Sequence, residues 1–361
     1  MNQINFRKFM SMYTPPHLSN RQTVFLYLAK LGQTFCLFSV LCLTSFSVYA
    51  DPSSTSTLKK APPVPPPSSA HQQSEEKGIP YPFLWSIQYK EGPLSYLFGT
   101  IHIPDSRFPH LHPLLNQAIQ EVDEIYAELD FNEKAQMMIS VMQKAQLPSG
   151  QSLQSILEPK LYKRLNEYFA KHKISLQSFF FFKPQFVEMI VSSLDILPLI
   201  QAGHPTLDEI VLQRGQQAKK KTGGIETLEE QLNLLFIPTQ KEAIHSLEHT
   251  LGYLEKQDLK GISLLAQMRK AYFSGQSSSI LKLLLKELDK STPSQKRILD
   301  RILYGRNKIM ADRIRDKMSQ TPTKQFLFAF GTAHFLGEKS IIDLLTSEQF
   351  KIKRLTPPPK P

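Results

Sequence analysis

Apolar and polar positions follow two periods along residues 79–355, and these periods predict strands and helices in alternation. Apolar runs of strand length predict strands at "FLWSIQY", "SYLFGTIH", "DEIYAELDF", "KQFLFAFGTAH" and "FKIKRL", and a further short strand ending at Ile225–Glu226. Glu91–Gly92 marks a turn between the first two strands. The 3.6-residue period predicts helices at "LHPLLNQAIQEV" and "GEKSIIDLLTSEQ".

The central part of the chain is predicted to be mostly amphipathic helix. Apolar side chains at i, i+4, i+7 and i+8 form one helical stripe, made of Leu161, Leu165, Tyr168 and Phe169. "SFFFFKPQFVEMIVSSLDIL" fits a very apolar helix or a helix pair, and helices continue through Met318. Strands alternating with helices indicate an α/β fold with a mostly parallel sheet. The central helices would then be an insertion or a cap on one domain, residues 79–355.

The two ends of the chain have a different composition. Residues 1–50 contain basic but no acidic residues, followed by a short apolar run that ends in Val48-Tyr49-Ala50. This pattern predicts a signal peptide cleaved after Ala50, and therefore a periplasmic or secreted protein. The alternative is an uncleaved membrane tether through residues 31–50. The Pro/Ser-rich residues 51–78 are expected to be a flexible linker, and residues 356–361 a disordered tail.

Composition and charge exclude several classes of function. The apolar fraction of 41% and the charged fraction of 21% are those of a globular protein. The formal net charge is +11, but no aromatic residues are interleaved with a basic stripe, which argues against a nucleic-acid partner. Both cysteines, Cys36 and Cys42, lie in the N-terminal apolar run. Once that run is removed, disulfides and thiolate chemistry are excluded, and a metal site must use His, Asp, Glu or water.

One pentapeptide occurs almost unchanged at two distant places, as "FGTIH" at Phe98–His102 and as "FGTAH" at Phe330–His334. Each copy follows an apolar strand, and ligands of open α/β sheets lie beyond the carboxyl ends of strands. Glycine in each copy allows the backbone to turn sharply and to approach a ligand closely. The repeat therefore predicts that the two histidines meet and bind one metal ion.

Two further predicted strands end in carboxylates, Glu128 in "EIYAELD" and Glu226 in "GGIET". Alternation places Glu128 on the same strand face as Tyr126 and Asp130. Two imidazoles with one or two carboxylates suit a divalent ion that keeps open positions for water. Such an ion lowers the pKa of its bound water and polarises a carbonyl, while a carboxylate that does not bind the ion can act as a general base.

Other acidic and histidine side chains are weaker candidates for this site. Asp130 is expected to be exposed or orienting. Asp105, three residues after His102, is expected either to support a metal-binding histidine or to cap a turn. "HSLEH" at His245–His249 matches the H-x-x-E-H pattern of inverted zinc peptidases. Both of its histidines are predicted to lie on the solvent face of a helix, away from the buried stripe, which argues against a zinc site.

The order and spacing of four motifs resemble the TraB/PrgY/GumN family, which includes the TIKI proteins. The motifs are the two FGTxH copies, "YAELD" at 126–130, and "GIETLEEQ" at 224–231. Arg306-Asn307 followed by "MADRI" also resembles the helix that precedes the last GTxH motif of that family. The resemblance covers roughly residues 82–355.

The resemblance implies an erythromycin-esterase/ChaN-like α/β core and a metal-dependent peptidase of the TIKI type. It implies manganese or cobalt as the ion, with zinc or iron as further candidates, and a peptide or protein as the substrate. The implied metal ligands are His102, His334 and Glu128, and the implied catalytic residues are Glu128, Glu226 and Arg306. Arg306 is expected to hold a substrate carboxylate or to orient Glu226.

Two other functions are compatible with the sequence. The same fold could sequester a peptide or a haem-like ligand without catalysis, with the histidines as ligand contacts. Alternatively, the Pro-rich linker could be a stalk that presents the central helices to a protein partner. The oligomeric state is not determined by these patterns.

Overall fold

The computed structural model describes residues 78–130, 134–236, 239–288, 300–346 and 349–356. The predicted signal peptide or tether, the predicted linker up to residue 77 and the predicted tail from residue 357 lie outside these ranges. Within the described ranges, no helix is both long enough and apolar enough to cross a membrane.

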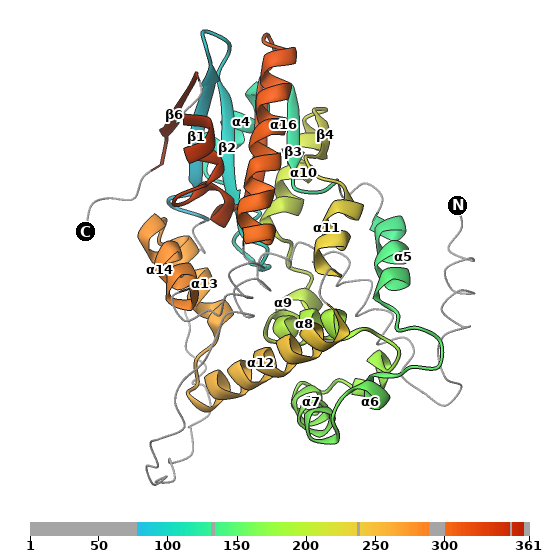
Figure 1. Ribbon diagram of the computed structural model, residues 1–361. Helices are drawn as coiled ribbons and strands as arrows, with labels where there is room; N and C mark the ends of the chain where they lie inside the picture. The colour runs from blue at the N-terminus through green and yellow to red at the C-terminus, as the bar shows by residue number, and fades with distance from the viewer. Residues whose placement is uncertain (1–77, 131–133, 237–238, 289–299, 347–348, 357–361) are drawn as a thin grey trace.

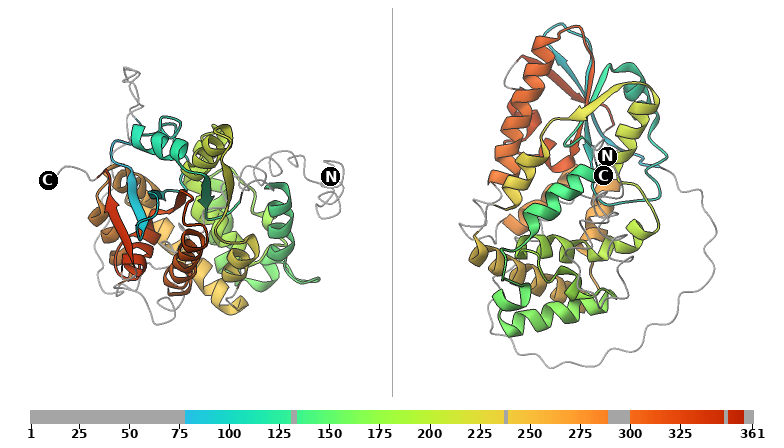
Figure 2. Two further views of the ribbon diagram at one scale, coloured as in Figure 1. Left: turned by 90° about the horizontal axis from the view of Figure 1, so that it is seen from above. Right: turned by 90° about the vertical axis from the view of Figure 1, so that its right-hand side faces the viewer.

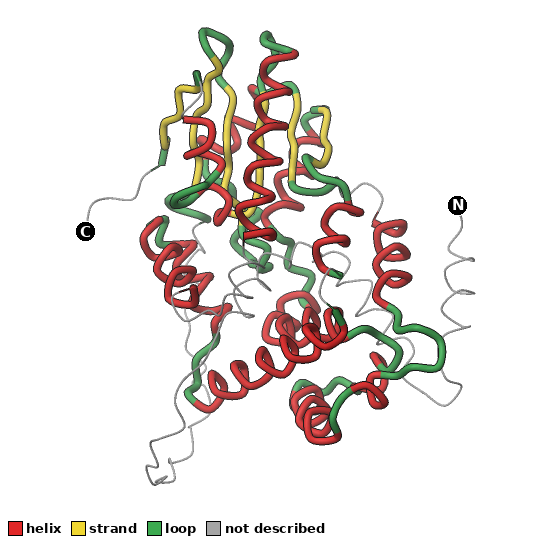
Figure 3. Tube along the Cα trace, viewed as in Figure 1, coloured by secondary structure: helices red, strands yellow, loops and turns green. Residues whose placement is uncertain are grey.

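A six-stranded sheet forms one end of the molecule (Figures 1 and 3). Its strands, in sheet order, are β4 (Lys221–Gly224), β3 (Glu124–Ala127), β5 (Phe326–Gly331), β2 (Ser95–Thr100), β1 (Phe83–Tyr89) and β6 (Phe350–Arg354). The first four are parallel to one another, and β1 is antiparallel to both of its neighbours. The predicted α/β class and mostly parallel sheet are confirmed, and the Glu91–Gly92 turn closes the β1–β2 hairpin.

Helices cover both faces of the sheet. In the right-hand view of Figure 2, α16 (Arg306–Gln320) lies on one side, and α4 (Pro113–Glu121) and α10 (Leu207–Gln217) lie on the other. The short α17 (Ile341–Thr346) packs beside α16. It begins later than the sequence predicts, because Gly337 and Lys339 both have positive φ angles, which a right-handed helix does not contain.

The remaining helices lie mostly beyond the carboxyl ends of the parallel strands, below the sheet in Figures 1 and 3. They are α5 (Lys134–Ala145), α6 (Leu153–Ile156), α7 (Pro159–Lys171), α8 (Pro184–Ser193), α9 (Leu197–Gln201), α11 (Leu228–Leu235), α12 (Gln240–Leu259), α13 (Leu264–Phe273) and α14 (Ser277–Leu288). The predicted stripe of α7 is buried at all four positions. The insertion in the sequence is thus a helical layer that faces the carboxyl edge of the sheet.

Two details of the prediction are corrected. In α12, His245 is exposed as predicted, but His249 is half-buried, because the buried face of this helix is wide enough to pack on both α7 and α8. Strand β3 ends at Ala127, earlier than predicted, since the Gly331 N–H of the neighbouring strand donates to the Glu128 carboxylate. Glu128 therefore stands just beyond the end of its strand.

Candidate metal centre at the carboxyl edge of the sheet

The two FGTxH copies lie side by side, because they end the adjacent parallel strands β2 and β5. Thr100 pairs with Gly331, so the copies are offset by one residue. The Thr332 hydroxyl donates to the Thr100 carbonyl oxygen over 2.8 Å. A Cβ at Gly99 would lie only 2.8 Å from Thr332 Oγ1, so glycine is what allows this close approach.

The two histidines reach the same carboxylate oxygen. Nε2 of His102 lies 3.4 Å from Glu128 Oε1, and Nε2 of His334 lies 3.7 Å from the same atom. All three side chains are at most 2% exposed. The prediction that the histidines of the repeat meet at the end of the Glu128 strand is confirmed.

The orientation of His102 is set by Asp208, which the sequence reasoning missed. Nδ1 of His102 lies 2.8 Å from Asp208 Oδ2, and the Thr100 hydroxyl donates to Asp208 Oδ1 over 2.7 Å. The carboxylate can only accept, so Nδ1 carries a proton, and Nε2 is the nitrogen directed at Glu128. Asp208 lies in the first turn of α10, between the capping-box residues Thr206 and Glu209, and is fully buried.

The prediction that Asp105 supports a histidine is wrong. Its carboxylate accepts from the guanidiniums of Arg107 and Arg269, and the backbone N–H of Arg107 also donates to it. The second of the two expected roles, capping a turn, agrees with this geometry. Proximity in sequence to His102 was misleading, because the loop after β2 turns away before it reaches Asp105.

Asn307 sets the orientation of His334. The Asn307 amide nitrogen donates to the Lys339 carbonyl oxygen over 2.8 Å, which turns its Oδ1 toward His334 Nδ1 at 2.6 Å. Nδ1 therefore carries the proton here too, and Nε2 faces Glu128 with a lone pair. Burial and the nearby Arg306 guanidinium lower the pKa of His334 to about 3, so the ring is neutral at physiological pH.

Arg306 joins the two predicted glutamates. Its Nη2 donates to Glu128 Oε2 over 2.5 Å and to Glu226 Oε2 over 2.6 Å, and its Nε donates to Glu226 Oε1 over 3.0 Å. Gln231 adds a hydrogen bond to Glu226 Oε2. Arg306 thus contacts Glu226, as one of its two expected roles requires, and is itself only 1% exposed.

The electrostatic balance keeps Glu128 ionised. Burial alone would raise its pKa, but Arg306, together with the two histidines, holds the pKa of this carboxyl well below its usual range. Burial likewise opposes the charge of Arg306, and Glu128 and Glu226 more than offset it, so the pKa of the guanidinium is raised. Asp130, at the same strand end, is exposed, which agrees with one of its two expected roles.

The donor set fits a cation. No ready-made cluster of three or more His, Cys, Asp or Glu side chains around an ion site is found within the described ranges. However, two buried imidazoles direct their Nε2 atoms at one carboxylate oxygen, and imidazole nitrogens and carboxylate oxygens are ligands that divalent ions accept. His102, His334 and Glu128 Oε1 are therefore the atoms that would hold a divalent ion.

Comparison with known proteins agrees with the motifs. The family model described as TraB/PrgY/gumN family matches residues 83–354. The chain belongs to this family. No solved structure matches the chain.

The curated relatives carry a functional name. "Metalloprotease TIKI1" of Danio rerio is 31% identical over 322 residues, which cover 77% of this chain and 64% of the relative. "Metalloprotease TIKI1" of Homo sapiens is 27% identical over 361 residues, covering 88% of this chain and 68% of the relative. "Metalloprotease TIKI2" of Danio rerio is 29% identical, covering 77% and 62%. The chain thus spans somewhat under two thirds of the first relative's length.

Proposed function

We propose that this family member is a metal-dependent hydrolase that cleaves peptide bonds, with a divalent ion held by His102, His334 and Glu128. The observation that carries the proposal is the convergence of both Nε2 atoms on Glu128 Oε1 at the carboxyl edge of the sheet. The metalloprotease names of relatives at 25–31% identity support the reaction class. The erythromycin-esterase/ChaN-like core belongs to the same proposal.

An ion at this place supplies a bound water of lowered pKa and a Lewis acid for the scissile carbonyl. Nitrogen and oxygen donors with no thiolate suit manganese or cobalt, and also accept zinc or iron. The protein residues hold these groups in place: Asp208 and Asn307 orient the two imidazoles, and Arg306 fixes the Glu128 carboxylate. Burial of these side chains excludes bulk water from the donors.

Glu226 and Arg306 act as a pair in this proposal. Both Glu226 oxygens accept hydrogen bonds from Arg306, so Glu226 holds the guanidinium in place against Glu128. Glu226 can act as a general base only after its hydrogen bonds to Arg306 break. A proton transfer by Glu226 would therefore require one of these two side chains to move. The residue therefore has a positioning role at rest.

The experiment measures metal content and cleavage together. The full chain, purified without chelator, is compared with the His102→Ala/His334→Ala variant by elemental analysis, and both are incubated with a peptide library read by mass spectrometry. The His245→Ala/His249→Ala variant is a matched control, because it removes a second histidine pair outside the centre. We expect about one ion per chain and cleavage products in the wild type and the control, and neither in the first variant.

Other results would contradict the metal centre or favour a different function. Metal retained in the His102→Ala/His334→Ala variant, or absent from the wild type after divalent ions are added back, contradicts the centre. Saturable peptide binding without products over hours favours a sequestering module. Haem binding, the other form of the sequestering function, has less support, because both histidines are buried and face Glu128. Export through residues 1–50 is also a proposal, which N-terminal sequencing of the mature protein tests.

A further inference from the structure

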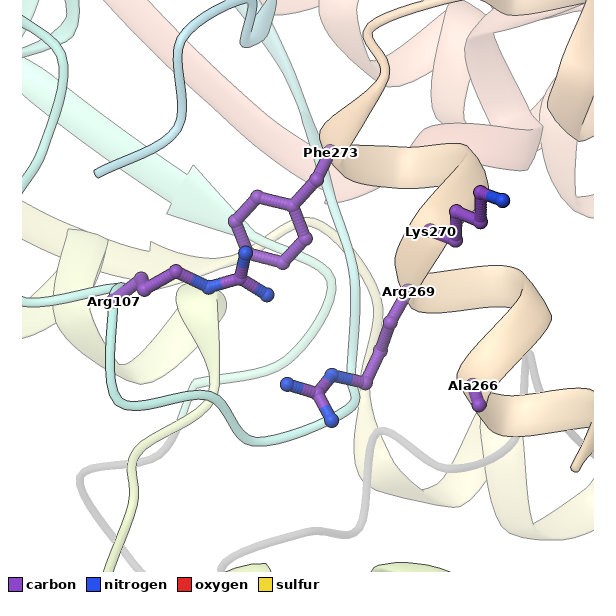
Figure 4. A pocket seen from close by; sticks show the side chains of 5 residues that line it. All are labelled: Arg107, Ala266, Arg269, Lys270 and Phe273. Atoms are coloured by element: carbon purple, nitrogen blue, oxygen red, sulfur yellow. The ribbon is translucent and has the colours of Figure 1, made fainter. Parts of the chain in front are cut away.

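A hollow of about 360 Å³ lies between the loop that follows β2 and helix α13 (Figure 4). It is lined by Arg107, Ala266, Arg269, Lys270 and Phe273. Figure 4 shows that Arg107 and Arg269 extend into the same space from opposite sides, whereas the Lys270 side chain leaves the helix on the other side. Two guanidiniums therefore dominate this hollow.

The helix and the loop that line the hollow also contact segments that carry residues of the candidate metal centre. The Tyr272 hydroxyl, next to Phe273 in α13, donates to the Gly99 carbonyl oxygen over 2.7 Å, inside the first FGTxH copy. The Asp105 N–H donates to the Pro205 carbonyl oxygen, just before the helix that carries Asp208. The same short loop that leaves His102 thus forms one wall of the hollow.

Asp105 holds both guanidiniums in fixed positions. Arg107 donates through Nε and Nη2, each over 2.8 Å, and Arg269 donates through Nε and Nη2 over 3.0 and 2.5 Å. The Arg107 guanidinium also lies over the Phe273 ring, 3.3 Å from its centroid. Neither arginine has to lose its side-chain freedom on binding a ligand, because these contacts already restrict it.

The charge at the hollow favours an anion. Asp105 is 1% exposed and accepts from both guanidiniums, which are 28% and 34% exposed. A single arginine can pair with a buried carboxylate in bidentate fashion. The second guanidinium adds positive charge at a surface that a ligand can reach, which the buried Arg306 does not offer.

We propose that Arg107 and Arg269 form a subsite that binds a carboxylate of the peptide substrate beside the metal centre. The inference rests on the proposed peptidase function for the identity of the substrate. The carboxylate has two sources, the C-terminus of a peptide or an Asp or Glu side chain, and the planar guanidinium fork recognises both. The subsite gives this chain a preference for acidic or C-terminal peptide segments.

The test titrates small probes into the full chain and follows the arginine Nε–H signals by NMR. N-acetyl-alanine presents a terminal carboxylate, the α-amide of N-acetyl-aspartate presents a side-chain carboxylate, and N-acetyl-alanine amide presents none. A chelator is present, so that a carboxylate on the metal cannot contribute. The result is therefore independent of metal binding, and failure of the metal centre and failure of the subsite are distinguishable.

We expect saturable binding of at least one carboxylate probe and none of the amide. Arg107→Gln and Arg269→Gln should each weaken it roughly tenfold. Arg164→Gln is the matched control, because Arg164 is also partly exposed, at 27%, and pairs with a carboxylate, Glu255, but does not line the hollow. It should leave binding unchanged. The probe that binds identifies the source of the carboxylate.

Equal behaviour of the carboxylate probes and the amide in the wild type overturns the proposal. Unchanged carboxylate binding in Arg107→Gln or Arg269→Gln overturns it as well. If a glutamine variant shows no cooperative thermal transition, it is not folded, and the lysine variant at the same position, Arg107→Lys or Arg269→Lys, is used in its place. Lysine keeps the charge but loses the bidentate fork, so weaker binding in a folded lysine variant supports the subsite.

Discussion

The chemistry of the centre depends on which ring nitrogen of each histidine carries the proton. Asp208 and Asn307 differ in charge, yet each accepts the Nδ1–H of its histidine and directs Nε2 at Glu128. Partners of this kind set the tautomer and orientation of metal-binding imidazoles. The histidines alone would not define a metal centre without these two residues.

Asp208→Asn tests this arrangement at a single residue. If the asparagine oxygen keeps the hydrogen bond from the Thr100 hydroxyl, its amide nitrogen faces His102 and favours the other tautomer, which places a proton on Nε2 where a metal needs the lone pair. We expect metal affinity to fall by about 10–100-fold, measured by competition with a metal-sensitive dye. Asp258→Asn, which removes a carboxylate of α12 that pairs with Lys171 of α7, should have no effect. Equal affinity in Asp208→Asn and the wild type would show that Asp208 is not needed to aim the ring.

The sequence offered little signal for Asp208. It lies in "TLDE", where Thr206 and Glu209 form a capping box, and an acidic residue in the first turn is ordinarily explained by the helix dipole. Asp105 was the more attractive candidate, since it follows His102 by three residues. Only the tertiary packing of α10 against the sheet brings Asp208 to the ring.

At the scale of elements, the repeat matters because its two copies end neighbouring parallel strands. The copies use their threonines differently: the Thr100 hydroxyl donates to Asp208, and the Thr332 hydroxyl donates to the Thr100 carbonyl. One threonine thus orients a histidine partner, and the other joins the two strand ends. Similar sequences have acquired different contacts because the copies are offset by one residue.

Gly99→Ala tests the close approach of the two strands. The new Cβ would meet Thr332 Oγ1 at 2.8 Å and Phe83 Cβ at 2.9 Å, so β2 must shift against its neighbours. Overpacking of this kind costs about 1–3 kcal/mol of unfolding free energy, which urea denaturation measures. Gly252→Ala, in α12 with only an Arg164 side-chain atom at 3.4 Å, should be neutral or stabilising. A Gly99→Ala variant as stable as the wild type would contradict the tight contact.

At the scale of the whole molecule, polar groups are divided between the two ends of the sheet. The carboxyl ends carry the histidines and face the helical layer (Figure 1). The opposite end of β3 carries Glu124, whose carboxylate contacts Tyr126, Lys221 and Lys324. The first cluster is proposed to serve function and the second stabilises the fold.

Glu124 predicts how stability depends on pH. Burial alone would raise the pKa of Glu124. Lys324, Tyr126 and Lys221 outweigh this effect and lower the pKa to about 2. Because the folded-state pKa lies below the usual 4.5, ionised Glu124 stabilises the folded state. This stabilisation is fully present above pH 4.5 and is lost as pH falls toward 2. Both lysines are largely exposed, so we expect the contribution to be about 1 kcal/mol.

The measurement is urea denaturation of the wild type and Glu124→Gln at several pH values. The wild type should be more stable at about pH 6, and the difference should shrink as pH falls to about 3. Glu167→Gln removes an exposed glutamate 4.0 Å from Lys163 and should show no such trend. A difference between wild type and Glu124→Gln that stays constant over this window would contradict the assigned cause.

Periodicity and the repeated pentapeptide determined the α/β class and placed both histidines and both glutamates at one edge of the sheet, because strand and helix periods are local and parallel strands share one carboxyl edge. Tertiary structure alone decided the rest. It placed Asp208 and Asn307 on the histidines, joined Glu128 to Glu226 through Arg306, and moved Asp105 to the two arginines. These contacts join residues distant in sequence, and only the packing of helices on the sheet selects among the polar partners that the sequence makes available.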